Sequence, residues 1–204
     1  MHWLICKERT EIILLLFIWA NAFEERKEII FLSSNEDNWM IRDIMEIRTA
    51  TIADLAQIAA VEAECFPAAE AATKEEFAER IKYYGNHFWL MFEGEKLIAF
   101  VDGFVTDKPD LTDEMYERAE MHDENGAWQM IFGVNTIPAY RKHGYAGQLL
   151  QCAIEDARKQ GRKGLVLTCK EKLIAYYAKF GFENEGISES VHGNVIWYQM
   201  RYKF

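Results

Sequence analysis

The sequence predicts an α/β domain with a mixed sheet of six or seven strands flanked by about four helices. Residues 128–135 and 164–169 are rich in apolar, β-branched and aromatic side chains, a composition typical of buried strands. Between these segments, apolar residues recur from Ala146 to Ala157 at offsets of 0, 3, 4, 7, 8 and 11, which describe one face of a helix. Strands that alternate with amphipathic helices in this way indicate the α/β class.

The domain is predicted to begin with a strand and a helix. Residues 46–49 have a strand pattern, and Thr51 with Asp54 forms a helix cap at the start of residues 51–66. Pro67 ends this helix, because proline lacks the amide hydrogen that would continue it. The positions of this helix predicted to face the core or lie near it are Leu55, Ile58, Ala59 and Glu62.

A second helix and a hairpin are predicted to follow. Thr73 and Glu76 form a capping box for a helix over residues 74–84. Residues 88–93 and 96–105 are predicted strands joined by a turn at Gly94. The residues predicted on one face of the helix are Phe77, Ile81 and Tyr84.

The remaining elements lie near the end of the chain. A short helix is predicted over residues 113–121, inside an otherwise polar stretch. The last two strands are expected to be separated near the sequence His192-Gly193-Asn194. No internal repeat and no low-complexity tract interrupts this order.

The loop before the helix of residues 146–157 has the features of an anion site. Arg141, Lys142 and His143 bring positive charge, and Gly144 lets the backbone approach a ligand closely. The free amides of a helix N-terminus and the helix dipole both favour a negative group at this position. The alternative interpretation is an ordinary helix start with a solvated basic loop.

A family resemblance distinguishes these interpretations. Arg141-x-x-Gly144-x-Ala146 matches the R/Q-x-x-G-x-G/A signature of the GNAT superfamily of N-acetyltransferases, and the frame Tyr177-x-x-x-Gly181-Phe182 follows at the distance typical of the family. Residues 45–204 therefore resemble a GNAT domain, which implies the GNAT (acyl-CoA N-acyltransferase) fold. The segments most similar to bacterial relatives of arylalkylamine N-acetyltransferases are residues 111–115, 129–133 and 197–200.

The resemblance implies a site for acetyl-coenzyme A (acetyl-CoA) as co-substrate. In the family, the basic loop holds the pyrophosphate and the preceding strand pairs with the pantetheine arm. Tyr177 occupies the position of the family's general acid, which protonates the leaving thiolate, whereas its neighbour Tyr176 is expected to pack on another helix face. The residues expected to bind acetyl-CoA are Ile131, Phe132, Gly133, Val134, Arg141, Lys142, His143, Gly144, Tyr145 and Ala146.

The general base does not follow from the resemblance. Arylalkylamine N-acetyltransferases use two histidines on the central strand, and the matching positions here are Met130 and Phe132, which cannot titrate. Glu64, Asp102 and His192 lie on segments that often border the acceptor cleft, so these three residues are alternative bases. A base that acts through ordered water, or capture of the small neutral fraction of the amine, would need none of them.

Composition and cysteine spacing limit the partners. The net charge of -10 and the pI near 5.1 argue against nucleic acid, which would require a basic surface. Cys6, Cys65, Cys152 and Cys169 have neither C-x-x-C spacing nor metal-ligand spacing, so we expect reduced cysteines in a cytoplasmic protein without a metal. The oligomeric state stays open, although GNAT proteins often form homodimers.

Residues 1–44 stand apart from the predicted domain. Their apolar run, residues 12–19, is too short for a membrane-spanning helix, which needs about 20 residues, so we expect no membrane partner. Three interpretations remain open: a segment packed on the domain, a weak signal sequence, or upstream sequence before a true start at Met40 or Met45.

The leading hypothesis is an acetyl-CoA-dependent N-acetyltransferase. The enzyme would transfer the acetyl group to a primary amine of a small molecule, by direct attack while both substrates are bound. One alternative is a protein or peptide N-acetyltransferase. Another is a regulatory module that binds acetyl-CoA without catalysis.

Overall fold

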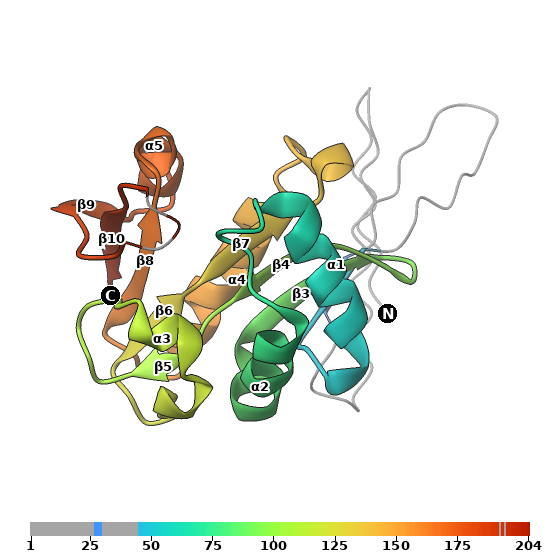
Figure 1. Cartoon of the computed structure of the whole chain (residues 1–204), viewed down its shortest axis with the longest axis horizontal. Helices are drawn as coiled ribbons and strands as arrows, with labels where there is room; N and C mark the ends of the chain where they lie inside the picture. The colour runs from blue at the N-terminus through green and yellow to red at the C-terminus, as the bar shows by residue number, and fades with distance from the viewer. Residues whose placement is uncertain (1–26, 30–44, 192, 194) are drawn as a thin grey trace, which may run out of the picture.

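The computed structural model of the chain describes residues 27–29, 45–191, 193 and 195–204, whose strands form two sheets (Figure 1). The first sheet has the order β1 (Lys27–Ile29), β2 (Met45–Arg48), β3 (Phe88–Glu93), β4 (Lys96–Asp102) and β7 (Gly133–Thr136). The second has the order β5 (Val105–Thr106), β6 (Trp128–Ile131), β8 (Gly164–Cys169), β10 (Tyr198–Lys203) and β9 (Glu183–Ile187).

Helices cover the first sheet on both sides (Figure 1). In the view of Figure 1, α1 and α2 lie in front of the sheet and α4 lies behind it. Both α1 and α4 contact β4, so this strand is buried on both faces, as its apolar sequence requires. The α-helices are α1 (Leu55–Cys65), α2 (Lys74–Tyr84), α3 (Glu114–Glu117), α4 (Tyr145–Lys159) and α5 (Ile174–Ala178). The 3₁₀ helices are η1 (Ile52–Asp54), η2 (Gly85–His87), η3 (Ala119–Met121), η4 (Pro138–Tyr140) and η5 (Glu171–Leu173).

The α/β class is confirmed, but two expected helices are shorter than predicted. The helix predicted from Thr51 begins as η1, and α1 starts only at Leu55. Asp54 explains this start, because its carboxylate accepts hydrogen bonds from Arg48 and from the Thr51 amide, at 2.6 and 2.8 Å. The helix predicted over residues 113–121 is divided into α3 and η3, because Arg118 has a non-helical backbone. The Thr73–Glu76 capping box of α2 is confirmed.

Two strands that were predicted as continuous are each broken in the structure. The predicted strand of residues 96–105 divides into β4 and β5, and that of residues 128–135 divides into β6 and β7 at Phe132. At the first break a Cβ on Gly103 would lie 1.8 Å from the carbonyl oxygen of Met130, so only glycine allows this close backbone approach. The amide of Phe132 donates to Asp102 across the second break, at 2.8 Å. The breaks lie opposite each other, and there the chain passes from one sheet to the other.

The parallel pairing of β6 with β8 ends at the same place. Trp128 to Ile131 pair with Gly164 to Leu167, and this is the only parallel pairing among the described strands. Beyond Ile131 the chain pairs with β4 as β7, whereas β8 continues beside β10 to Cys169. The two central strands therefore separate from this point onward.

The described parts of the chain show how the first segment meets the domain. β1 pairs antiparallel with β2 at the edge of the first sheet, with Lys27 opposite Ile47. The rest of residues 1–44, including Cys6, lies outside the described residues. Within the described residues, every helix is too short or too polar to cross a membrane.

Candidate active site

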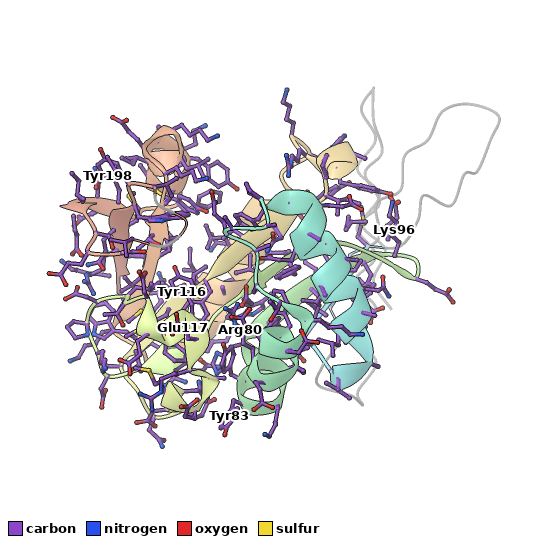
Figure 2. The ribbon with its side chains drawn as sticks, in the orientation of Figure 1. Arg80, Tyr83, Lys96, Tyr116, Glu117 and Tyr198 are labelled. Carbon is purple, nitrogen blue, oxygen red and sulfur yellow. The ribbon has the colours of Figure 1, made fainter. Side chains whose placement is uncertain are left out.

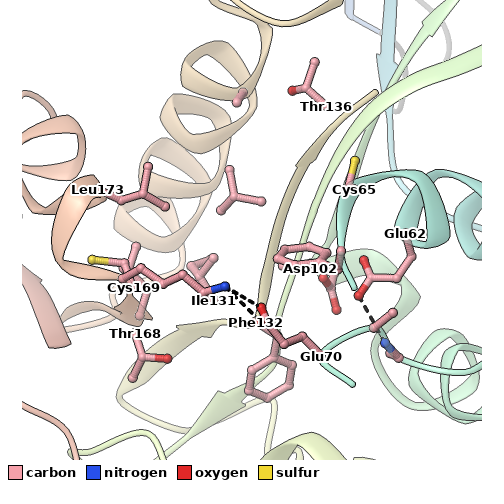
Figure 3. Close-up of a pocket in the computed structure, with 18 of the residues that line it drawn as sticks. Glu62, Cys65, Glu70, Asp102, Ile131, Phe132, Thr136, Thr168, Cys169 and Leu173 are labelled. Atoms are coloured by element: carbon pink, nitrogen blue, oxygen red, sulfur yellow. Dashed lines mark hydrogen bonds and ion pairs between the residues drawn. The ribbon is translucent and has the colours of Figure 1, made fainter. Parts of the chain in front are cut away.

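A cavity of about 980 Å³ lies where β7 and β8 separate. One wall carries Glu62 from α1 and Asp102 from β4, and the other carries Thr168 and Cys169 from β8 (Figure 3). Because the strands diverge, the cavity is formed by the fold itself and does not depend on the opening of a loop. Such a crevice beside the carboxyl ends of diverging strands is a usual ligand site in α/β proteins.

The backbone of β7 gives the cavity one strand edge. β4 pairs with one side of β7, and no described strand pairs with the other side. An extended ligand that carries amide groups can add to this edge as a further strand would. Ile131, Phe132, Gly133 and Val134 line the cavity along this stretch.

The N-terminus of α4 gives the cavity a second binding element. Its N-cap Gly144 has a left-handed backbone with φ of +86°, and no side chain caps the first turn. Lys142 also has a positive φ, of +68°, and no acidic residue lies in the first turn. A Cβ at Gly144 would meet no atom within 4 Å, so glycine is favoured by its φ and not by close approach. The uncapped amides and the adjacent cations fit an anionic group.

The cavity brings together most of the site residues predicted from the sequence. His143 is the exception: its ring nitrogen Nδ1 lies 3.2 Å from the carbonyl oxygen of Tyr140, and its ring stacks on Tyr145. The predicted residues that line the cavity are Ile131, Phe132, Gly133, Val134, Arg141, Lys142, Gly144, Tyr145, Ala146 and Tyr177.

Two tyrosines of α5 line the cavity together. Tyr177 is buried, and this burial raises the pKa of its phenol, so the side chain keeps its proton at neutral pH. Tyr176 was expected to pack on another face of the helix; its ring packs against that of Phe180, with the centroids 5.3 Å apart, and the residue also lines the cavity. Its ring meets that of Tyr177 edge to face, with the centroids 5.2 Å apart.

Buried charges lie behind the first wall. Arg80 of α2 and Asp102 form an ion pair, with Nη1 3.3 Å from Oδ2. Arg80 also donates from Nη2 to the carbonyl oxygen of Tyr116, at 3.0 Å; both residues are labelled in Figure 2. Burial raises the pKa of Asp102 to about 6, although Arg80 opposes this shift. The guanidinium therefore ties α2 to both β4 and α3.

Glu62 is the titratable group of this wall that the sequence left unassigned. Its side chain is 6% exposed and lines the cavity. Burial raises the pKa of Glu62 to about 7, and the nearby charge of Asp102 adds to this effect. Glu62 and Arg80 each occupy a position on the apolar face of a helix. A charged residue at such a position is the feature of the sequence that could have indicated a functional role.

The three bases considered from the sequence have different placements. Glu64 is exposed and does not line the cavity, so the structure separates it from the site. Asp102 lines the cavity, but Arg80 is paired with it. His192 lies outside the described residues.

Aromatic side chains form part of the cavity beside Phe132. Its ring lies 4.8 Å from that of Tyr116 and 5.0 Å from that of Phe104, measured between centroids. The Tyr116 hydroxyl lies 3.2 Å from Thr168 Oγ1, so this contact connects α3 with β8. Tyr116 was not expected at the site, because the sequence of its polar segment does not reveal where that segment folds.

A group with metal-ligand chemistry, His87, His122 and Glu124, lies away from this cavity. Hydrogen bonds explain its geometry without an ion. His122 Nδ1 accepts from the Val105 amide at 3.2 Å, so Nε2 carries the proton and faces Glu124. Metal binding at Nε2 would first require the loss of that proton.

Comparison with known proteins identifies the family. The model of the Acetyltransferase (GNAT) family matches residues 55–182, which is more than half of the chain. The chain therefore belongs to the GNAT family of acetyltransferases. It is an acyltransferase of a family that uses acetyl-CoA. None of the curated proteins compared with the chain matches its sequence.

Solved structures share the fold at low sequence identity. The loading GNATL domain of CurA from Lyngbya majuscula is 16% identical, with a TM-score of 0.68, covering 78% of this chain and 97% of its own. The GphF GNAT-like decarboxylase in complex with isobutyryl-CoA is 21% identical, with a TM-score of 0.67, and the coverages are 77% and 98%. The ribosomal-protein-S18-alanine N-acetyltransferase from Escherichia coli is 18% identical, with a TM-score of 0.58 and coverages of 78% and 93%.

Proposed function

We propose that the protein transfers the acetyl group of acetyl-CoA to a primary amine of a small molecule, with both substrates bound at once. The observation that carries this proposal is the combination of elements around one cavity. A free strand edge and an uncapped helix N-terminus lie beside buried carboxyl groups. The first two suit an amide-containing anionic donor, and the third suits a basic acceptor.

The donor would be held mainly by backbone groups. Amides of Lys142 to Ala146 would bind the pyrophosphate, with added charge from Arg141 and Lys142. The edge of β7 would pair with the pantetheine arm, and an amide between Ile131 and Val134 would polarise the thioester carbonyl. These contacts would fix the donor before the acceptor arrives, which lowers the entropy cost of the reaction.

Tyr177 would act as the general acid. Its phenol is buried, lines the cavity and keeps its proton at neutral pH, so it can donate to a thiolate as the carbon–sulfur bond breaks. Tyr176 lies in the same cavity but is less buried. It therefore provides the matched comparison for Tyr177.

A cationic amine with an apolar body would fit the acceptor half. Phe132 and Tyr116 supply an aromatic surface, while Glu62 and Asp102 supply carboxyl groups. This combination agrees with the resemblance to arylalkylamine N-acetyltransferases. Phe132 stands where that group has a histidine. The proton of the acceptor ammonium would therefore have to be taken by a different group.

Two alternatives use the same donor site. A peptide acceptor is one, because a structurally similar protein is a ribosomal-protein-S18-alanine N-acetyltransferase. A regulatory module that only binds acetyl-CoA is the other. We favour catalysis, because Tyr177 and buried carboxyl groups are not required for binding alone.

Thiol release from acetyl-CoA tests the proposal. The wild-type protein should release thiol with some member of a panel of primary amines, and less readily with peptides. Tyr177→Phe should lower kcat by about 100-fold, whereas Tyr176→Phe should change it far less. Release with peptides alone would favour the first alternative. Binding of acetyl-CoA without turnover on any amine or peptide would contradict the enzyme.

A further inference from the structure

We propose that Glu62 is the general base of the reaction and takes a proton from the ammonium form of the acceptor. This inference rests on the proposed N-acetyltransferase function and adds its missing residue. An amine is mostly protonated at neutral pH, and a protonated nitrogen cannot attack a carbonyl. Met130 and Phe132 cannot remove that proton, so a base supplied by a side chain has to be a different residue of the cavity.

The carboxyl group of Glu62 has one oxygen fixed and one available. Oε1 accepts a hydrogen bond from the Ala72 amide at 3.1 Å, which orients the side chain. Oε2 is buried and has no partner within hydrogen-bond distance among the described residues, although the Asn135 side chain lies close enough to lower the pKa of Glu62. The residue lines the cavity, on the wall opposite Thr168 and Cys169 (Figure 3). A buried carboxylate oxygen without a donor is costly, and an ammonium hydrogen would satisfy it.

The surroundings of Glu62 favour proton exchange near neutral pH. Burial and the charge of Asp102 raise its pKa, while Arg80, the Ala72 amide and the Asn135 side chain lower it, leaving a value of about 7. Burial raises the pKa of the Cys65 thiol, one turn further along α1, and keeps it neutral. Cys65 therefore adds no charge beside Glu62. A base that is half protonated at the working pH can both accept a proton and release it.

The other carboxyl groups around the cavity are already engaged or exposed. Glu70 forms an ion pair with Lys170, at 2.8 Å, and Asp102 forms one with Arg80. Asp113 accepts hydrogen bonds from the Ser190 hydroxyl and the Val191 amide. Glu76 caps α2 through Thr73, and Glu117 is exposed. Asp102 also has a buried oxygen without a partner, Oδ1, but its carboxylate is paired with Arg80. Among these carboxyl groups of the described residues, Glu62 alone is buried, has an oxygen without a partner and lacks an ion pair.

The proton balance assigns Glu62 one definite step. The ammonium gives its first proton to Glu62, which passes it to solvent through the cavity. The neutral nitrogen then forms a bond to the acetyl carbon as the carbon–sulfur bond breaks. The nitrogen loses its second proton to solvent, and the departing sulfur gains one from Tyr177, which takes a proton back from solvent. Ammonium and thioester thus become amide, thiol and one released proton.

A pH profile of Glu62→Gln tests this role against Glu64→Gln. Glu64 lies on the same helix but is exposed and away from the cavity, so its variant controls for charge. The wild-type kcat/KM should rise with pH through an apparent pKa near that of Glu62. Glu62→Gln should have a kcat/KM about 100-fold lower than the wild type, without this rise with pH, while Glu64→Gln should match the wild type. Glu62→Asp should keep the rise at a lower rate.

The acetyl-CoA dissociation constant and the amine dependence separate catalysis from structure. Glu62→Gln should bind acetyl-CoA with the same dissociation constant as the wild type. Its loss of kcat/KM should be smallest with weakly basic amines, which are neutral at the assay pH. If the wild type is active and Glu62→Gln has the same rate and pH profile, the role of Glu62 is overturned and the proposed function is not. A wild type that acetylates no amine would overturn the proposed function, and the role of Glu62 with it.

Discussion

Arg80 and Asp102 form a buried ion pair between α2 and β4, with 3.3 Å between Nη1 and Oδ2. Both side chains are almost fully excluded from solvent. The guanidinium lies over the rings of Phe77 and Phe132, at 5.3 and 5.4 Å from their centroids. The pair therefore connects two elements that frame the cavity, α2 and β4, through buried charges. Without its partner, either side chain would be an uncompensated buried charge.

Loss of Arg80 should destabilise the fold strongly. Arg80→Met leaves the Asp102 carboxylate buried without its counter-charge, and we expect a loss of about 3 to 5 kcal/mol in the free energy of unfolding. Urea denaturation measures this loss. The double variant Arg80→Met/Asp102→Asn should recover part of it. Arg118→Met breaks exposed ion pairs with Glu114 and Glu120 and should change stability little, so equal losses in both single variants would contradict the argument.

The stability of the protein should fall with rising pH because of Glu62. Its native pKa of about 7 lies above the ordinary 4.5, so the folded state holds this proton more tightly than the unfolded state. The resulting stabilisation is complete below the ordinary pKa and is lost as the pH rises through the native one. Between about pH 4 and pH 8 the wild type should lose about 3 kcal/mol more than Glu62→Gln. Parallel stability curves for the two proteins would contradict this.

The basic loop should contribute unequally to acetyl-CoA binding. Lys142 lines the cavity beside the N-terminus of α4, whereas the adjacent His143 does not. Lys142→Ala should weaken acetyl-CoA binding by about fivefold at low salt, as expected for one exposed ion pair. The effect should shrink as salt is added. Calorimetric titration measures both, and a larger loss for His143→Ala would show that the loop binds its anion differently.

Residues 45–204 should fold and act without the preceding segment. Among the described residues, those that line the cavity lie between Glu62 and Trp197, and the pairing of β1 with β2 is at a sheet edge. A chain that begins at Met45 should therefore bind acetyl-CoA and turn over as the full chain does. Thermal unfolding and the thiol-release assay check this expectation. Insolubility of the shorter chain would count against it.

The parts of the fold that depend on local patterns could be predicted from the sequence. The Thr73–Glu76 capping box depends on residues three apart, and the structure forms it as expected. The loop from Arg141 to Gly144 precedes a helix, as its composition indicates. The strand breaks at Phe132 and Gly103 could not be predicted, because each exists only through contact with the facing segment.

The acceptor half of the site was harder to predict for the same reason. Glu62 and Arg80 occupy inward positions of their helices, so a buried charge was signalled, but its partner was not. Asp102 ends an apolar strand, and only the tertiary fold brings it to Arg80. Tyr116 comes from a polar segment with no distinctive pattern.

Transfer of an isotopically labelled acetyl group tests the central claim most directly. The protein is incubated with acetyl-CoA labelled in the acetyl carbonyl and with each amine of the panel, and the products are analysed by mass spectrometry. We predict that the label appears in an amide of a primary amine, together with an equal amount of free thiol, and that Tyr177→Phe slows both. Labelled acetyl-CoA that is bound but never yields a labelled amide, with any amine or peptide, would contradict this account.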